Sequence, residues 1–279
     1  MDTALLKKFA PQIRQKLLDE IALRLESLLT TDSLEHREES ERIRVLQQEI
    51  ARTSKDAVIR RGAYTWFNRL CALRFMDVQQ YTPLGVVSPR ENFTLPELLQ
   101  QAKGGQIPEE FARHVDFPRI RDILAGKIPS FAPQQEAYRM LLHGACLYYA
   151  GLFPRMFHDT RDYLFLFMPR DLVSEKSVLA EIRQVLTPEN CRNVEVLGWL
   201  YQFYIAERKD QVYAGFRKNK KAAPEDIPPA TQLFTPHWIV RYLVENSLGR
   251  LWMQNRPDSK LITKMDYWVS NSGKWEVGS

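Results

Sequence analysis

The feature that most constrains the fold is the spacing of apolar residues in the first thirty positions. Between residues 4 and 29 they recur at intervals of three and four, at Leu6, Phe9, Ile13, Leu17, Ile21, Leu25 and Leu28. This spacing places them on one face of an α-helix, which must bury that face against other elements. Pro11 lies near the start of the pattern. Because proline suits the first turn of a helix and not its interior, we expect the helix to restart there.

The same spacing recurs along the chain and predicts a mainly α fold. We expect helices at 41–53, 56–80, 135–157, 174–186 and 194–216, the fourth of which begins with a serine cap. Proline and glycine in residues 81–134 indicate loops joining short helices. Two short runs stay ambiguous: PLGVVS could be a weak strand, and YLFLFMP could be a buried strand or a hydrophobic docking segment.

Arginines decorate the predicted helix at 56–80, at positions Arg60, Arg61, Arg69 and Arg74. They could form a basic face toward phosphate. We favour the alternative that they are solvated or paired with carboxylates, since charge on a helix usually marks its wet side.

Composition narrows the class of protein without fixing its function. The chain of 279 residues has 39 Lys and Arg, 34 Asp and Glu and a pI near 9.0, which permits nucleic-acid binding but does not require it. The charged N-terminus resembles neither a signal peptide nor a membrane anchor, and no apolar run could span a bilayer. Cys71, Cys146 and Cys191 form no CxxC pair, so we expect buried, reduced thiols in a cytoplasmic protein.

Motifs that would indicate catalysis are absent from the sequence. It contains no GxxxxGK[ST], GxGxxG, HExxH or GxSxG. No two histidines have metal-ligand spacing on one helix, and we interpret His143 as structural. The HDTRD run at 158–162 is more typical of a solvated turn than of a metal cluster. We therefore predict no catalytic residue and no metal.

The most informative stretch is ATQLFTPHWIVRYLV, which begins at residue 230. Thr235 can cap a helix whose first residue is Pro236. The free N–H groups of that helix start favour a carboxylate or phosphate, and Phe234 offers an apolar wall beside them. Capping alone would also explain this pattern. Beyond it runs a predicted docking stripe, formed by Ile239, Val240, Leu243, Val244 and Leu248.

These residues carry a resemblance to a known family. TQLFTPHWIVRYLVENSLGRLW is similar to the segment ahead of the catalytic domain in amino-methylating DNA methyltransferases. Together with TWFNRLCALRFMDV and the segment that begins EVLGWLYQFYIAERKD, it resembles PglX-type adenine-specific methyltransferases of BREX phage-defence systems. The resemblance extends from about residue 1 to about residue 268. It implies S-adenosylmethionine as cofactor, bordered by Gln232, Phe234, Thr235 and Pro236, with Phe234 near the methionine moiety and Thr235 near its carboxylate.

The sequence departs from this family after LITKMDYW. Family enzymes continue with a DPACGSGH-like turn that cradles the cofactor and an NPPY loop that grips the extruded adenine, and neither occurs here. We therefore expect the amino-terminal region of such an enzyme as a truncated product, inactive by itself. The expected partners are the missing methyltransferase core or other defence-system proteins. An alternative is a non-catalytic module that binds DNA or protein.

A basic loop is the candidate DNA contact, formed by Arg217, Lys218, Lys220 and Lys221 and flanked by Tyr213 and Phe216. Phosphate contacts from it would be independent of base sequence and would weaken with salt. A solvated linker is the alternative.

The predicted organisation has three parts. A helical, bundle-like N-terminal domain spans 1–222, and a proline-rich connector spans 223–230. Residues 231–279 are the start of an α/β methyltransferase domain.

Overall fold

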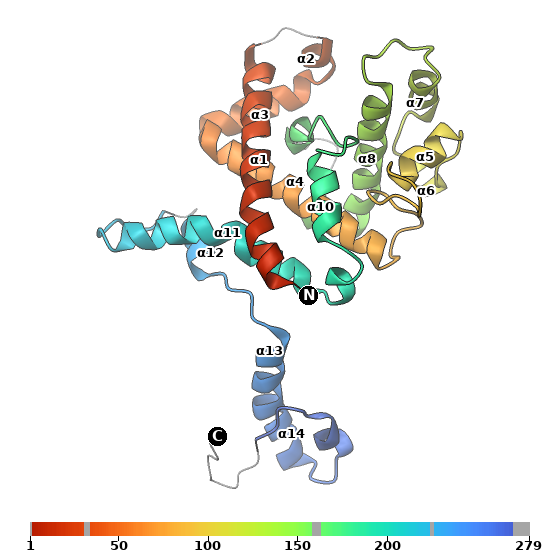
Figure 1. Ribbon diagram of the computed structural model, residues 1–279. Coiled ribbons are helices and arrows are strands. Elements are labelled where there is room, and N and C mark those ends of the chain that lie inside the picture. The colour runs from red at the N-terminus through yellow and green to blue at the C-terminus, as the bar shows by residue number, and fades with distance from the viewer. Residues whose placement is uncertain (1, 31–33, 158–162, 224–225, 270–279) are drawn as a thin grey trace. The chain divides into compact units, whose positions relative to one another are not determined.

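A computed structural model describes residues 2–30, 34–157, 163–223 and 226–269 (Figure 1). Those ranges are mainly helical and contain no strand, which confirms the helical class. The α/β methyltransferase part stays a prediction. The chain divides into two compact units, Met1–Glu207 and Arg208–Ser279, each of which is described by itself. None of the described helices is long and apolar enough to cross a bilayer.

The first unit is built from helices of very different lengths. Its elements are α1 (Thr3–Thr30), α2 (Leu34–Glu38), α3 (Ser40–Arg52), α4 (Lys55–Val78), α5 (Glu97–Lys103), α6 (Glu109–Ala112), α7 (Phe117–Leu124), α8 (Pro133–Leu152), α9 (Pro154–Phe157), the 3₁₀ turn η1 (Tyr163–Phe167), α10 (Val178–Val185), the 3₁₀ turn η2 (Asn190–Arg192) and the start of α11 (Glu195–Phe216). The helices predicted at 56–80 and 194–216 are confirmed. The helix predicted at 135–157 is confirmed only to Leu152, because Pro154 begins the separate helix α9.

Helix α4 is the centre of this unit. It contacts α1, α3, α9, α10 and η1, while α8 gathers α5, α6, α7 and α9 on its other sides (Figure 1). Eleven of the residues of α4 are buried, including Trp66 and Phe67. At the N-terminus of α4, the Ser54 side chain caps the helix by accepting a hydrogen bond from the Ala57 amide.

The predicted restart at Pro11 is wrong, because α1 runs unbroken through it. An interior proline removes one N–H donor from the helix and crowds the carbonyl four residues earlier. The neighbouring residues Phe9, Ala10 and Ile13 are all buried in the core. Burial on both sides of the proline therefore offsets the lost hydrogen bond.

The two runs that sequence left ambiguous are not strands. Residues 163–167 of YLFLFMP form η1, and all five side chains are buried. The Trp66 indole Nε1 donates to the Leu164 carbonyl at 2.7 Å, which ties η1 to α4. PLGVVS forms turns around the Asp77 carboxylate, which accepts hydrogen bonds from the amides of Val86 at 3.0 Å and Val87 at 2.8 Å.

Four arginines on α4 were predicted to be solvated, paired with carboxylates or directed toward phosphate. For two of them this prediction is wrong. Arg69 is completely buried and donates to the carbonyls of Met156 at 3.1 Å and Phe157 at 2.9 Å. Arg74 is half-buried and donates to the Leu186 carbonyl at 2.9 Å. The acceptors of these two guanidinium groups are therefore backbone carbonyls from segments distant in sequence, and not water. Arg60 and Arg61 are exposed, as expected.

All three cysteines are buried and free, as predicted. Burial raises the pKa of each thiol, to about 12 for Cys146. Because the thiolate is the reactive form, these groups are inert structural residues.

The second unit starts within α11 and continues in short elements. They are α12 (Ile227–Thr231), α13 (His237–Val244), the π-helical turn η4 (Glu245–Gly249), α14 (Arg250–Asn255) and the 3₁₀ turn η5 (Lys260–Lys264). Helix α12 overlaps the stretch 223–230 that was predicted as a proline-rich connector and ends one residue beyond it. Pro228 and Pro229 fall in its first turn, where a missing N–H donor is tolerated.

Candidate functional site

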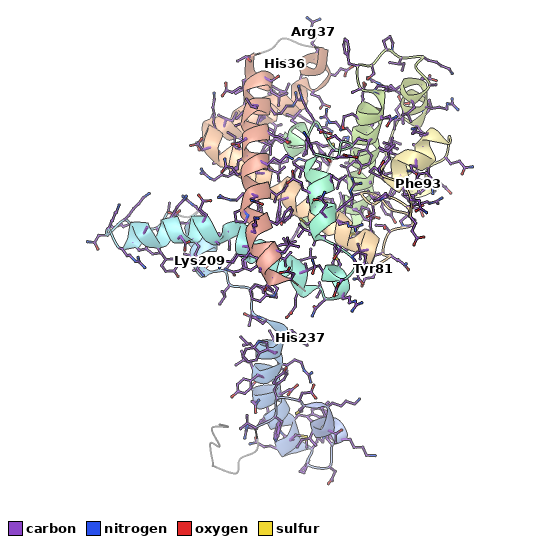
Figure 2. The ribbon with its side chains drawn as sticks, in the orientation of Figure 1. His36, Arg37, Tyr81, Phe93, Lys209 and His237 are labelled. Atoms are coloured by element: carbon purple, nitrogen blue, oxygen red, sulfur yellow. The ribbon has the colours of Figure 1, made fainter. Side chains whose placement is uncertain are left out.

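The segment that resembles a cofactor edge is extended and leads directly into α13. Gln232 and Thr235 are exposed, whereas Phe234 and Pro236 are half-buried. Figure 2 labels His237, the first residue of α13. The four predicted residues thus lie together in one short piece of backbone.

The predicted cap at Thr235 is wrong. Pro236 has a ψ of 145°, which is extended backbone, so the helix begins one residue later and Pro236 itself occupies the N-cap. Its carbonyl accepts from the amides of Ile239 at 3.0 Å and Val240 at 3.2 Å. Proline has no side-chain acceptor, so the N-cap residue itself makes no side-chain cap. The first N–H groups of a helix have no acceptor within it, and here the N-cap side chain supplies none.

A π-helical turn separates α13 from α14 and carries a buried carboxylate. Glu245 accepts from the Arg241 Nε at 2.9 Å and from the Tyr267 amide at 2.6 Å. Arg241 also donates to Asp266 at 2.5 Å and to the Lys264 carbonyl at 2.9 Å. These contacts fasten the returning segment 264–267 to the helix. Sequence analysis missed this pair, although its spacing of four on a helix is a recognisable signal.

Asn246, which follows Glu245, also binds the returning segment. Asn246 donates from its side-chain amide to the Tyr267 carbonyl at 2.7 Å and accepts from the Val269 amide at 2.8 Å. Arg250 donates to the Val269 carbonyl at 2.8 Å, and its guanidinium lies 5.2 Å from the centre of the Trp268 ring. Polar groups, therefore, hold this part of the chain in shape.

Apolar side chains of the same part remain uncovered. Of residues 227–269, only Glu245 and Gly249 are buried. Four of the five residues in the predicted docking stripe are exposed, and only Ile239 is half-buried. Further exposed apolar residues are Leu233, Trp238, Tyr242, Leu251, Trp252, Leu261, Ile262, Tyr267 and Val269. An apolar surface of this kind is typical of an interaction site.

The predicted basic residues lie together in the turn that ends α11. Arg217, Lys218, Lys220 and Lys221 are all exposed. The amides of Lys218 and Lys220 both donate to the Gly215 carbonyl, at 2.9 and 3.0 Å. This double contact reverses the chain and holds the four basic side chains within one turn.

The remaining histidines and carboxylates of the described ranges are the possible metal ligands. The described ranges contain no group of three His, Cys, Asp or Glu residues that could hold a metal ion. His143 packs on Phe165, with ring centres 4.3 Å apart. Burial and the nearby guanidinium of Arg42 lower the pKa of His143 to about 4, so it is neutral at physiological pH. The HDTRD run lies outside the described residues.

Comparison with known proteins identifies homologues over most of the chain. It is 40% identical over 220 residues to an adenine-specific methyltransferase BrxX of Escherichia coli O9:H4 (strain HS), covering 77% of this chain and 17% of the relative. It is 32% identical over 297 residues to an adenine-specific methyltransferase PglX of Lacticaseibacillus casei (strain Zhang), covering 91% of this chain and 24% of the relative. No protein-family model matches.

These matches confirm the resemblance drawn from the sequence. The chain spans between 17% and 24% of the length of the two relatives. Their similarity therefore concerns one part of a much longer protein.

Proposed function

The chain is a homologue of adenine-specific methyltransferases over most of its length, and we propose that it is the helical region of an enzyme that methylates adenine in DNA. S-adenosylmethionine would supply the methyl group, and a BREX-type phage-defence system in the cytoplasm would be the setting. The homology carries this proposal, and the exposed apolar surface of 233–269 supports it. Such a surface suits a segment that packs against a methyltransferase core.

The extended segment 232–236 would border the cofactor. Phe234 would contact the methionine moiety, while the Thr235 hydroxyl and the first amides of α13 would meet its carboxylate. Three observations favour this role. Thr235 is exposed, Phe234 is half-buried, and the N-cap residue is a proline, which supplies no side-chain acceptor of its own. An anion is stabilised at such a helix start by N–H donors and by the helix dipole.

A chimaera tests this function directly. We would replace the matching segment of the Escherichia coli BrxX relative with this chain and measure adenine methylation of host DNA. Methylation should persist, because the two segments are 40% identical. A folded chimaera without methylation would contradict the proposed function.

Variants of the same chimaera test the cofactor edge. Phe234→Ala and Thr235→Ala should each raise the KM for S-adenosylmethionine by about 5- to 150-fold, since each contact contributes about 1–3 kcal/mol. Phe93→Ala is the matched control, because Phe93 is an exposed aromatic residue of the first unit (Figure 2). An unchanged KM in both variants would remove the proposed role of 232–236 and leave the family function intact.

By itself, the chain should not transfer methyl groups. Its sequence contains neither a DPACGSGH-like turn nor an NPPY loop, and extrusion of a base needs the pocket that those motifs build. Incubation with labelled cofactor and DNA should leave the DNA unlabelled. Labelled adenine would show that this chain contains a complete active site.

The exposed basic turn at 217–221 favours DNA contact as a second role. Each phosphate contact contributes about 0.9 to the slope of log affinity against log salt concentration. A gel-shift series should therefore lose about 3 to 4 units of slope when all four basic residues become Gln. Lys7→Gln with Lys8→Gln is the control, because both lysines are exposed on α1. Absence of a shift even at low salt would exclude DNA binding by this chain alone.

A further inference from the structure

The shape of the basic turn at 217–221 is set by the way in which α11 ends. Helix α11 stops at Phe216, and Asn219 has a φ of 57°, in the left-handed region. The Asn219 amide donates to the Phe216 carbonyl at 3.0 Å, and the Lys220 amide donates to the Gly215 carbonyl at 3.0 Å. Two such bonds around one left-handed residue form a Schellman motif, which satisfies the last carbonyls of a helix. The backbone of the turn therefore has one defined conformation.

An acidic residue ties the chain that leaves this turn back to α11. Asp226 is 6% exposed and accepts hydrogen bonds from the Arg208 guanidinium at 2.5 Å and from the Ala223 amide at 3.1 Å. The hollow that Arg208, Phe216 and Asp226 help to line has a volume of only about 30 Å³. Such a hollow holds about one water molecule, so the returning chain lies close against α11.

A second contact joins α12 to the same part of α11. The Tyr213 hydroxyl donates to the Ala230 carbonyl at 3.2 Å, and Figure 1 shows α12 beside α11. The rings of Tyr213 and Phe216 pack edge to face, with their centres 5.8 Å apart. The basic turn is thus held on both sides, by the end of α11 and by the chain that leads into α12.

The four basic side chains of the turn are available to an anion. Arg217, Lys218, Lys220 and Lys221 are exposed, and within the described ranges no ion pair joins any of them to a carboxylate. The nearby acid, Asp226, is directed to a different cation on α11. Its carboxylate therefore shapes the turn without neutralising the charges that the turn presents.

We propose that the Arg208–Asp226 pair positions the basic turn for the phosphates of duplex DNA, so that an acidic residue strengthens binding to a polyanion. The inference rests on the proposed DNA contact of this turn. A turn that is already ordered loses less conformational entropy when it contacts phosphates. Such contacts set the position of a protein on DNA and carry no base sequence. Asp226 is a positioning residue, which acts through the four basic side chains.

A pair of aspartate variants tests the role of Asp226. Asp226→Ala and Asp210→Ala each raise the net charge by one, and Asp210 is exposed on the same helix. Charge alone predicts tighter DNA binding by both variants. Positioning predicts that Asp226→Ala binds a labelled duplex about fivefold more weakly or worse, with a salt slope lower by about one unit. Asp210→Ala should bind at least as well as the unmodified chain. Equal or tighter binding by Asp226→Ala would overturn the proposal.

Variants at Asn219 test the shape of the turn with no change in charge. Glycine adopts the left-handed conformation without strain, so Asn219→Gly should keep the DNA affinity. A β-branched residue is strained there, so Asn219→Val should weaken binding about fivefold. Equal affinity of the two variants would show that the conformation of the turn is irrelevant to DNA binding.

Hydrogen exchange without DNA separates this inference from the proposed DNA role. In Asp226→Ala, the amides of Lys218 and Lys220 should exchange faster, whereas the protection of the first unit should not change. Unchanged exchange at these two amides would contradict positioning by Asp226. If the unmodified chain binds no duplex even at low salt, the DNA role fails and the inference fails with it. If it binds and Asp226→Ala binds equally well, the inference alone fails.

Discussion

The first unit and residues 227–269 are stabilised by different kinds of interaction. In the first unit, α4 and its neighbours bury their apolar residues in one continuous core. In residues 227–269 the buried positions are a carboxylate and a glycine, Glu245 and Gly249, while most large apolar side chains face outward. The first arrangement draws its stability mainly from removal of apolar surface from water. The second depends on hydrogen bonds around the π-helical turn, each of which contributes only about 0.5–1.5 kcal/mol.

The two regions therefore differ in how much they depend on contacts with another part of a protein. A region with its own core keeps its shape in isolation. A region that exposes Trp238, Leu243 and Leu248 has a surface ready for a partner. Such a surface supports the proposed packing of residues 233–269 on a methyltransferase core.

The largest difference is expected between two tryptophans. Trp66 is completely buried and donates to a carbonyl, so Trp66→Ala should destabilise the first unit by about 3–5 kcal/mol. Trp252 is half-exposed and donates to the Ser259 hydroxyl at 3.0 Å, so Trp252→Ala should cost about 1 kcal/mol or less. Chemical denaturation followed by circular dichroism measures both. Similar losses of unfolding free energy in the two variants would contradict the difference in burial between the two regions.

Removal of the buried guanidinium should have the next largest effect. Arg69→Met leaves the carbonyls of Met156 and Phe157 without their donor, and we expect a loss of about 3 kcal/mol. Arg60→Met on the same helix is the control and should change stability by less than about 0.5 kcal/mol, because Arg60 is exposed. Urea midpoints compare the two. If the midpoints agree, Arg69 does not stabilise the core.

The buried histidine gives the core a predictable pH dependence. The pKa of His143 is about 4 in the folded chain and 6.5 without burial, so below pH 6.5 the unfolded state takes up the proton first. The stabilising contribution is complete above pH 6.5 and is lost as pH falls through 4, by up to roughly 3 kcal/mol. His143→Gln should flatten the pH dependence of the unfolding free energy over this window. An unchanged profile would show that His143 is hydrated.

A pair of glycines gives the smallest effect. A Cβ at Gly62 would lie 2.8 Å from the Phe167 ring, so Gly62→Ala should destabilise by about 1 kcal/mol after the gain in helix propensity. A Cβ at Gly151 meets nothing within 4 Å, so Gly151→Ala should stabilise by at most about 1 kcal/mol. Thermal melting separates the two signs. A more stable Gly62→Ala protein would mean that α4 and η1 are not in close contact.

The spacing of apolar residues predicted the long helices well. The wrong predictions concern residues whose contacts lie far away in the sequence. The period of apolar residues was enough to place α1, α4, α8 and α11. It could not show that Arg69 is buried, since its acceptors lie 87 and 88 residues further along the chain. It also could not place η1, because a short apolar run has no distinguishing period.

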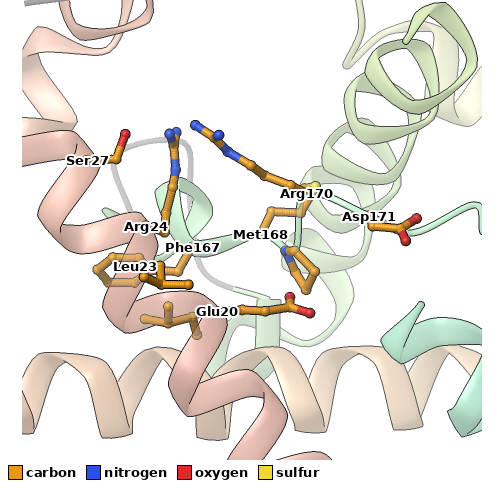
Figure 3. A pocket seen from close by; sticks show the side chains of 10 residues that line it. Glu20, Leu23, Arg24, Ser27, Phe167, Met168, Arg170 and Asp171 are labelled. Atoms are coloured by element: carbon orange, nitrogen blue, oxygen red, sulfur yellow. The ribbon is translucent and has the colours of Figure 1, made fainter. Parts of the chain in front are cut away.

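The candidate site was predicted as a segment but not in its detail. Sequence brought Phe234, Thr235 and Pro236 together, yet the extended backbone at Pro236 removed the cap expected from Thr235. Arg24 and Arg170 are far apart in sequence, and only the packing of α1 against the segment after η1 makes them line the same pocket (Figure 3).

Hydrogen exchange of backbone amides in the chain alone tests the central contrast most directly. Amides of α4 should exchange only through global unfolding, whereas those of α13 and α14 should exchange through local opening, faster on the order of 10²-fold or more. This result would show that the region with exposed apolar residues has little stability of its own. Equal protection of α4 and α13 would contradict the account, because hydrogen bonds around Glu245 would then suffice without a covering surface.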